Sequence, residues 1–142
     1  MRMKIQDFFE AQHQLPDTEF LITKACNHYH GHTYKVVVEF DGDEMRGGMI
    51  IDFKGIKKLI ATMDHTAIYQ VGNPMIDYLK QIKSEQSIIV LQDPPSSENI
   101  AKYIYKIIQD EYSSFGIKNL SIAVCEGYKG EERACWTTYR GE

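Results

Sequence analysis

An unbroken alternation of side chains between His30 and Phe40 constrains the fold of this 142-residue chain more than any other stretch of its sequence. Successive residues of a β-strand point to opposite faces of a sheet, so this segment has one apolar face and one mixed face. Two histidines, His30 and His32, stand at the start of the apolar face. A second alternation, from Lys4 to Leu15, predicts a neighbouring strand. The chain therefore begins with two half-buried strands.

The rest of the chain switches between helical and extended patterns. Asp52 is expected to cap a helix that begins at Phe53, and Asn73–Pro74 are expected to begin a second helix. A longer helix with an isoleucine stripe follows the run 94–97 and ends at Gly116. Further strands are expected in the segments SIIVL (87–91), NLSIAVCEGY (119–128) and ACWTTYRGE (134–142).

These elements predict an α+β fold in which one domain spans residues 1–142. The core is expected to be an antiparallel four-stranded sheet with the helices on one face, and SIIVL is a short additional strand. The other face and the edges of such a sheet need a cover. Association of subunits into a closed barrel would provide one, since closure removes unpaired edges, so we expect a homo-oligomer.

Charge and cysteine content narrow the class of protein. A net charge of −4 argues against a general nucleic-acid binder, which carries a basic surface. The first residues lack the apolar core of a signal peptide, and the longest aliphatic run, IIVL, is too short to span a bilayer. Three cysteines without a CxxC pair favour a reducing compartment over a disulfide framework. We expect a cytoplasmic protein with no nucleic-acid or membrane partner.

Three histidines are arranged as zinc ligands would be. His30 and His32 project from the same strand face, and His13 lies on the matching face of the neighbouring strand. A catalytic Zn²⁺ keeps three protein ligands and one open position, and imidazole nitrogen is among its preferred donors. His28 shares the parity but precedes the strand, so it is a spare candidate. The alternative interpretation is a solvated strand end without a metal.

Other ionisable residues allow more than one interpretation. Cys26, four residues before His30, is a base or nucleophile beside a metal-bound substrate, a fourth metal ligand, or a small buried hydrophobe. Asp64 and His65 form either a proton-transfer pair or a helix end favoured by the helix dipole. Glu126 stands in an otherwise apolar strand. Its carboxylate either lies on the polar face or accepts two N–H donors from a planar heterocycle.

In combination these motifs resemble the 6-pyruvoyltetrahydropterin synthase / 6-carboxytetrahydropterin synthase family over nearly the whole chain. The matching segments, in the family's order, are FEAQHQL (9–15), CNHYHGH (26–32), GMIIDF (48–53), MDH (63–65), SSEN (96–99) and Glu126. The sequence departs from the family at Gly127, where threonine is usual, and in the following loop KGEER. The segment from Thr66 to Pro95 is longer than in compact members.

The resemblance implies a tunnelling fold (T-fold) in which trimers close a barrel and two trimers stack as a hexamer. Active sites would then lie between subunits. The implied site residues are the zinc ligands His13, His30 and His32; the general base Cys26 with its proton-relay partners Asp64 and His65; and Glu126, Ser96 and Ser97 as contacts to a pterin ring.

Within the family, the cysteine four residues before HGH implies a 6-carboxy-5,6,7,8-tetrahydropterin synthase of queuosine (7-deazapurine) biosynthesis. Such a lyase converts 7,8-dihydroneopterin triphosphate to 6-carboxytetrahydropterin and releases acetaldehyde and triphosphate. Three alternatives stay open. The chain could be a pyruvoyl-forming synthase with the same residues, a pterin- or purine-binding protein without catalysis, or a protein with a purely structural zinc.

Overall fold

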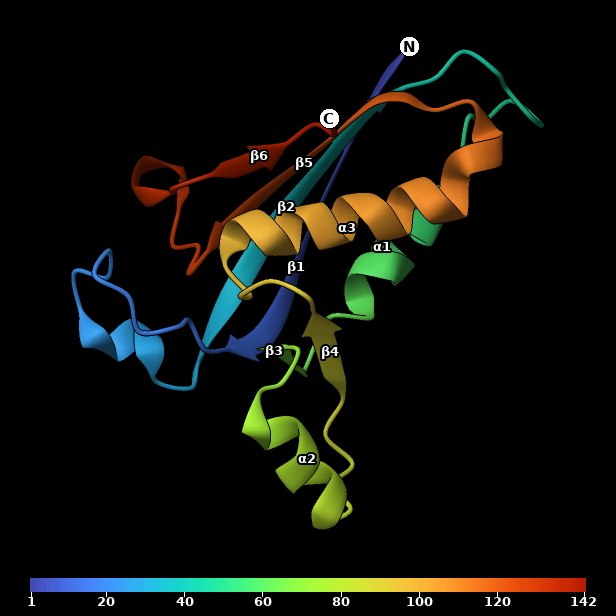
Figure 1. The fold of residues 1–142 in the computed structure, drawn as a ribbon. Helices are drawn as coiled ribbons and strands as arrows, with labels where there is room; N and C mark the ends of the chain where they lie inside the picture. Colours follow the sequence, from blue (N-terminus) through green and yellow to red (C-terminus); the bar gives the residue numbers. More distant parts are fainter.

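Six strands form one sheet, in the order β4-β3-β1-β2-β5-β6, in a computed structural model that describes residues 1–142 (Figure 1). The elements are β1 (Arg2–His13), β2 (His30–Asp41), α1 (Phe53–Ala61), β3 (Thr66–Gln70), α2 (Pro74–Gln81), β4 (Ile88–Leu91), α3 (Ser97–Tyr112), β5 (Lys118–Glu126) and β6 (Thr137–Tyr139). Three short 3-10 turns are η1 (Lys24–Asn27), η2 (Ser113–Phe115) and η3 (Glu131–Arg133). No helix is both long enough and apolar enough to cross a membrane.

The two long strands β1 and β2 pair antiparallel along their whole length, from Arg2 opposite Asp41 to His13 opposite His30. The alternation predicted for β2 is confirmed, because Tyr34 and every second residue after it to Phe40 are fully buried. Helices α1 and α3 cover this face of the sheet (Figure 1). The core therefore lies between the two helices and one face of the sheet.

The sheet has six strands where the sequence predicts four, and one side of it is parallel. β3 pairs parallel with β1, and β4 pairs parallel with β3. The missed strand β3 has its first four residues all buried, so its sequence shows no alternation. Buried parallel strands are continuous apolar runs for this reason. Helix α2 connects β3 to β4 as the crossover that parallel strands require.

The predicted helix starts are confirmed. A side-chain oxygen of Asp52 accepts a hydrogen bond from the backbone N–H of Lys54 at 2.9 Å. Asn73 caps α2 in the same way, with proline at its start. α1 ends at Ala61, so Asp64 lies in the turn that leads to β3 and not in the helix itself.

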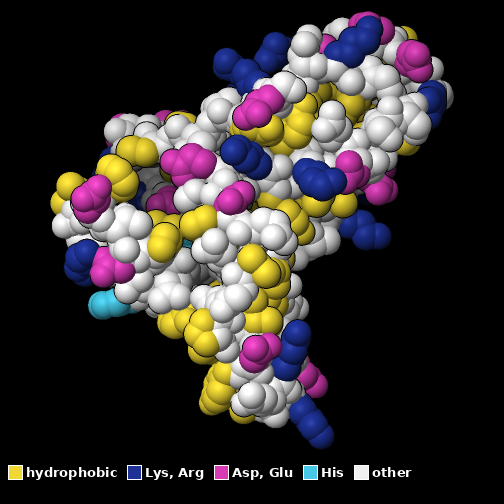
Figure 2. Space-filling view, in the orientation of Figure 1, with side chains coloured by type: hydrophobic (Ala, Val, Ile, Leu, Met, Phe, Trp, Pro, Cys, Tyr) yellow, Lys and Arg dark blue, Asp and Glu magenta, His cyan; other side chains and the backbone are white.

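The segment from β3 to β4 projects from the rest of the molecule as an arm with α2 at its tip (Figure 1). Hydrophobic side chains gather along this arm in Figure 2. Its exposed large hydrophobic residues are Val71, Tyr78, Ile82 and Val90. An apolar surface of this kind is suited to contact with another protein surface.

A test of the helix packing concerns Gly55, where a β-carbon would overlap the hydroxyl of Tyr112 on α3. Alanine normally stabilises a helix interior by about 1 kcal/mol relative to glycine. Because of the overlap, we expect Gly55→Ala to lower the free energy of unfolding by about 1 to 3 kcal/mol. Urea denaturation measures the change.

Removing the overlapping hydroxyl should recover most of the loss, so Gly55→Ala/Tyr112→Phe is the rescue variant. Lys57→Ala, on an exposed position of α1, is the control for a change of helix propensity. A Gly55→Ala protein as stable as the unsubstituted one would contradict this packing.

Candidate metal centre

The end of the β1–β2 pair brings three histidines together. His13 and His30 are direct partners in the ladder, and His32 follows two residues later on the same face. One ring nitrogen of each residue lies within 4.8 Å of the others. His13 is fully buried, whereas His30 and His32 are partly exposed. The three histidines predicted to lie together therefore do so, and the cluster is shielded from solvent at His13.

Backbone carbonyls orient two of these rings. Nδ1 of His13 lies 2.7 Å from the carbonyl oxygen of Pro95, and Nδ1 of His30 lies 2.6 Å from that of His28. A carbonyl can only accept a hydrogen bond, so both Nδ1 atoms carry the proton. In the neutral rings both Nε2 atoms then present lone pairs, and these two atoms face each other at 3.0 Å. Two lone pairs at this distance repel unless a cation shares them.

The charge state of the cluster also suits a metal ion. Burial lowers the pKa of His13 to about 4, opposed by the hydrogen bond to Pro95 and supported by the charges of His30 and His32. Burial also lowers the pKa of His32. Neutral imidazole is the form that binds a metal. Tetrahedral zinc with bonds of about 2.0 to 2.1 Å separates its nitrogen ligands by about 3.3 Å, so the trio fits Zn²⁺ with one position open.

Cys26 lies outside this ligand set. It is half-buried in η1, and its backbone carbonyl accepts a hydrogen bond from the N–H of Leu15 at 3.1 Å. No hydrogen bond joins its thiol to a histidine, and the group of residues able to hold a metal does not include it. His28 is exposed and contributes only its backbone carbonyl.

Asp64 and His65 form a hydrogen-bonded pair at the edge of β1. Oδ2 of Asp64 accepts from Nδ1 of His65 at 2.8 Å, and Oδ1 accepts from the backbone N–H of Glu10 at 2.7 Å. The Glu10 N–H, followed by His65, holds the pKa of Asp64 below its usual value. The φ of His65 is 58°, in the left-handed region that few residues other than glycine adopt. Its N–H donates to the carbonyl of Glu10 at 2.7 Å and so fixes the turn.

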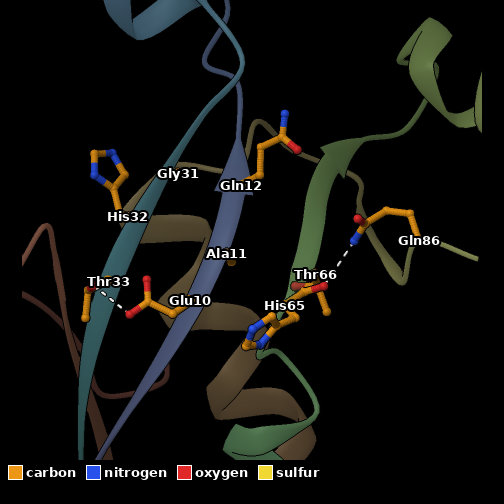
Figure 3. A pocket seen from close by; sticks show the side chains of 9 residues that line it. All are labelled: Glu10, Ala11, Gln12, Gly31, His32, Thr33, His65, Thr66 and Gln86. Atoms are coloured by element: carbon orange, nitrogen blue, oxygen red, sulfur yellow. Dashed lines mark hydrogen bonds between the residues drawn. The ribbon is translucent and has the colours of Figure 1, made fainter.

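A polar cavity of about 510 Å³ opens beside His65 on the outer face of the sheet (Figure 3). His65 borders it from the segment before β3, whereas the ring of His32 points away from it, toward His30 and Tyr34 (Figure 3). The other lining residues are Glu10, Ala11, Gln12, Gly31, Thr33, Thr66 and Gln86. The ring of the acid–histidine pair therefore borders this space, whereas the three-histidine cluster lies on the other face of the sheet.

Glu126 ends β5 directly opposite Tyr34 of β2. Although the residue is exposed overall, desolvation raises the pKa of its carboxyl group, opposed by His30 and assisted by Glu98. The pKa of this carboxyl group thus depends on His30 of the histidine cluster and on Glu98 at the start of α3. Beneath it, the hydroxyl of Tyr34 is buried without a hydrogen-bond partner.

The two predicted serines lie at the start of α3. The hydroxyl of Ser96 caps the helix by accepting from the N–H of Asn99 at 3.4 Å. Oγ of Ser97 lies 3.0 Å from Oγ1 of Thr137 on β6. Both hydroxyls therefore have protein partners, and both residues are half-buried beside the carbonyl that orients His13.

The sequence analysis did not predict three interactions of the site. The Pro95 carbonyl orients His13, but a backbone atom leaves no sequence signal. The charge of Glu98 raises the pKa of Glu126. The only sequence signal for this residue was its place in the segment SSEN (96–99). Gly127 adopts φ 64°, and a β-carbon there would lie 3.5 Å from Nδ1 of His32. The departure from threonine at Gly127 thus lies directly beside a ring of the cluster.

Sequence comparison places the chain among pterin-related proteins. It matches the family described as 6-pyruvoyl tetrahydropterin synthase over residues 2–142. It is 33% identical over 128 residues to a Pyrococcus abyssi protein provisionally named 6-carboxy-5,6,7,8-tetrahydropterin synthase, which covers 83% of this chain and 79% of that protein. A Haemophilus influenzae 6-carboxy-5,6,7,8-tetrahydropterin synthase is 29% identical over 97 residues, covering 61% of this chain and 69% of that protein.

Solved structures share the fold. An uncharacterized protein of Wolinella succinogenes superposes with a TM-score of 0.72 at 20% identity, covering 100% of this chain and 99% of the other. The 6-pyruvoyl tetrahydropterin synthase of Plasmodium falciparum gives a TM-score of 0.65 at 19% identity. The superposition covers 99% of this chain and 98% of the other. The tunnelling fold that the family resemblance implies is therefore confirmed.

The ligand set can be tested with a pair of histidine variants. His30→Ala should weaken zinc binding by at least about a hundredfold, because even changes to residues that only orient a ligand cost about 10- to 100-fold. His28→Ala keeps the backbone carbonyl that orients His30, so its zinc affinity should stay within about twofold of the unsubstituted protein. Competition with a chromophoric chelator measures both affinities. Equal losses in the two variants would contradict the assignment.

Proposed function

The chain belongs to the 6-pyruvoyl tetrahydropterin synthase family, and from that premise we propose that it is a zinc-dependent 6-carboxy-5,6,7,8-tetrahydropterin synthase. Its substrate is 7,8-dihydroneopterin triphosphate, and its products are 6-carboxytetrahydropterin, acetaldehyde and triphosphate. This step belongs to queuosine (7-deazapurine) biosynthesis. The relatives from Pyrococcus abyssi and Haemophilus influenzae support the carboxy-forming reaction, since both bear the name of that synthase.

The observation that carries the proposal is a three-histidine cluster that leaves out Cys26, the cysteine four residues before His30. A structural zinc site is closed by four protein ligands, whereas a catalytic one leaves a position open for substrate. His13, His30 and His32 supply three nitrogens, and Cys26 is not within ligand range of them. We infer that the half-buried thiol of Cys26, four residues before His30, serves proton transfer at the open position.

Each residue then has a defined task. Zinc bound by the three histidines would acidify hydroxyl groups of the substrate side chain. Sγ of Cys26 accepts a proton from that side chain. On its other side, Nε2 of His65 exchanges a proton, because Asp64 occupies Nδ1 and so leaves Nε2 free. The Glu126 carboxylate accepts two N–H groups of the pterin ring, and Ser96 and Ser97 are further contacts to that ring.

The base and the relay are too far apart in one chain to serve one substrate. The Asp64 side chain is bonded at Glu10, whereas the turn of Cys26 is bonded at Leu15. Five residues of extended chain correspond to roughly 16 Å. In the proposed enzyme, Cys26 and the histidine cluster of one subunit therefore face Asp64 and His65 of another. The short edge strands β4 and β6 and the apolar arm are available for this association, in a trimer or hexamer.

Product analysis tests the reaction directly. Zinc-loaded protein incubated with 7,8-dihydroneopterin triphosphate should form 6-carboxytetrahydropterin and an equal amount of acetaldehyde, identified by mass spectrometry. A pyruvoyl product without acetaldehyde would replace this function by that of the pyruvoyl-forming synthase. No product from protein with stoichiometric zinc would refute both, and pterin binding alone would then favour a non-catalytic binding protein.

The role of Cys26 can be separated from that of the metal. Cys26→Ala should keep its zinc and lose about 10²- to 10⁴-fold in kcat, the contribution usual for a positioned general base. Cys135→Ala is the matched control, because Cys135 is an exposed cysteine outside the proposed site. Its kcat should be unchanged. Full activity of Cys26→Ala would remove Cys26 from the mechanism.

A further inference from the structure

A chain of side-chain amides connects the arm to the turn that carries Cys26. Nε2 of Gln14 donates to the backbone carbonyl of Asn27, the residue after Cys26, at 2.8 Å. Oε1 of Gln14 accepts from Nδ2 of Asn73 at 3.2 Å. Asn73 is the cap of α2 and lies 59 residues further along the chain. Two hydrogen bonds therefore link the base of the arm to η1.

The direction of this chain is determined by its last acceptor. The carbonyl of Asn27 can only accept, so the amide nitrogen of Gln14 must point to it. Oε1 of Gln14 then faces the arm and requires a donor, which Nδ2 of Asn73 provides. Oδ1 of Asn73 accepts from the N–H of Met75 at 2.9 Å and from the hydroxyl of Tyr29 at 3.2 Å. A carboxamide is needed at both positions, since each side chain donates at one end and accepts at the other.

The turn is also tied directly to the end of β1. Nδ2 of Asn27 donates to the carbonyl of Leu15 at 2.9 Å, and the N–H of Leu15 donates to the carbonyl of Cys26. Gln14 itself follows His13, the buried member of the metal cluster. The position of Cys26 relative to His13 is thus determined by hydrogen bonds that Cys26 and Asn27 make to Gln14 and Leu15.

These bonds can be lost without collapse of the fold. Gln14, Asn27 and Asn73 are half-buried and line a cavity of about 240 Å³. Water can enter a polar cavity of this size and replace a missing partner. Water satisfies the exposed groups but does not hold η1 in one place. Substitutions here should therefore affect the position of the turn more than the stability of the protein.

We propose that Asn73 and Gln14 are positioning residues that hold the Cys26 thiol at its working distance from the metal cluster. The inference rests on the proposed function, in which Cys26 is the base. Proton transfer needs donor and acceptor within hydrogen-bond range, and a shift of about 1 Å can reduce a rate about a hundredfold. The arm thereby acts on the active site of its own chain, in addition to offering a surface for association.

Two nearly isosteric variants break one bond each. Asn73→Asp keeps the acceptor for Met75 and Tyr29 but cannot donate to Gln14. Gln14→Glu keeps the acceptor for Asn73 but cannot donate to the carbonyl of Asn27. Gln81→Glu makes the same amide-to-acid change at an exposed position of α2 and is the control.

We expect kcat to fall about tenfold in Asn73→Asp and Gln14→Glu, with KM, zinc content and Tm close to those of Gln81→Glu. The thiol itself gives a second readout that needs no turnover. Iodoacetamide should modify Cys26 at least about three times faster in both variants, as followed by peptide mass spectrometry, because a loosened turn exposes the sulfur.

The two readouts separate failure of this inference from failure of the proposed function. Unchanged kcat in both variants, or a kcat loss that follows a loss of zinc or of Tm, would overturn the positioning role. If the unsubstituted protein shows no turnover, the proposed function fails and the alkylation rate alone decides. If Cys26 in Asn73→Asp and Gln14→Glu is then modified as slowly as in Gln81→Glu, the hydrogen bonds of Gln14 and Asn73 do not position the turn.

Discussion

The antiparallel register of β1 against β2 is the constraint from which the rest of the structure follows. It sets His13 directly opposite His30 and stacks Phe9 on Tyr34, with ring centroids 4.8 Å apart. A slip of one residue would turn every side chain of a strand to the other face and carry the buried Phe9 into water. The apolar contacts that stabilise the sheet thus also determine the spacing of the histidines that could hold a metal.

Helix α3 supplies the second constraint on the site. Ser96 caps the helix, which leaves the carbonyl of Pro95 outside the helical hydrogen bonds and directed at Nδ1 of His13. The ring of His13 is therefore oriented by a buried residue just before α3, and the isoleucines of that helix, such as Ile100, belong to the core. The placement of the histidine cluster therefore depends on the packing of α3, because the Pro95 carbonyl orients the ring of His13.

Much of the fold could be predicted because its signals are local. The alternation in β2 and the caps Asp52 and Asn73 need only neighbouring residues, and the structure bears them out. The strand count was wrong because β3 is buried on both faces, so its side chains show no period. Burial on both sides depends on which elements cover a strand, and this information is distributed over the whole chain.

The sequence by itself determined which donors share a face: His13, His30 and His32 follow from a period of two in paired strands. It also set Cys26 close to them along the chain. Only the tertiary structure decided that two Nε2 atoms face each other and that His13 is neutral, since both depend on carbonyls and burial supplied by distant segments. The attachment of His65 to Glu10 and of the Cys26 turn to Leu15 was decided in the same way. Long-range packing determines such distances, because local periodicity specifies direction but not the neighbour that a side chain meets.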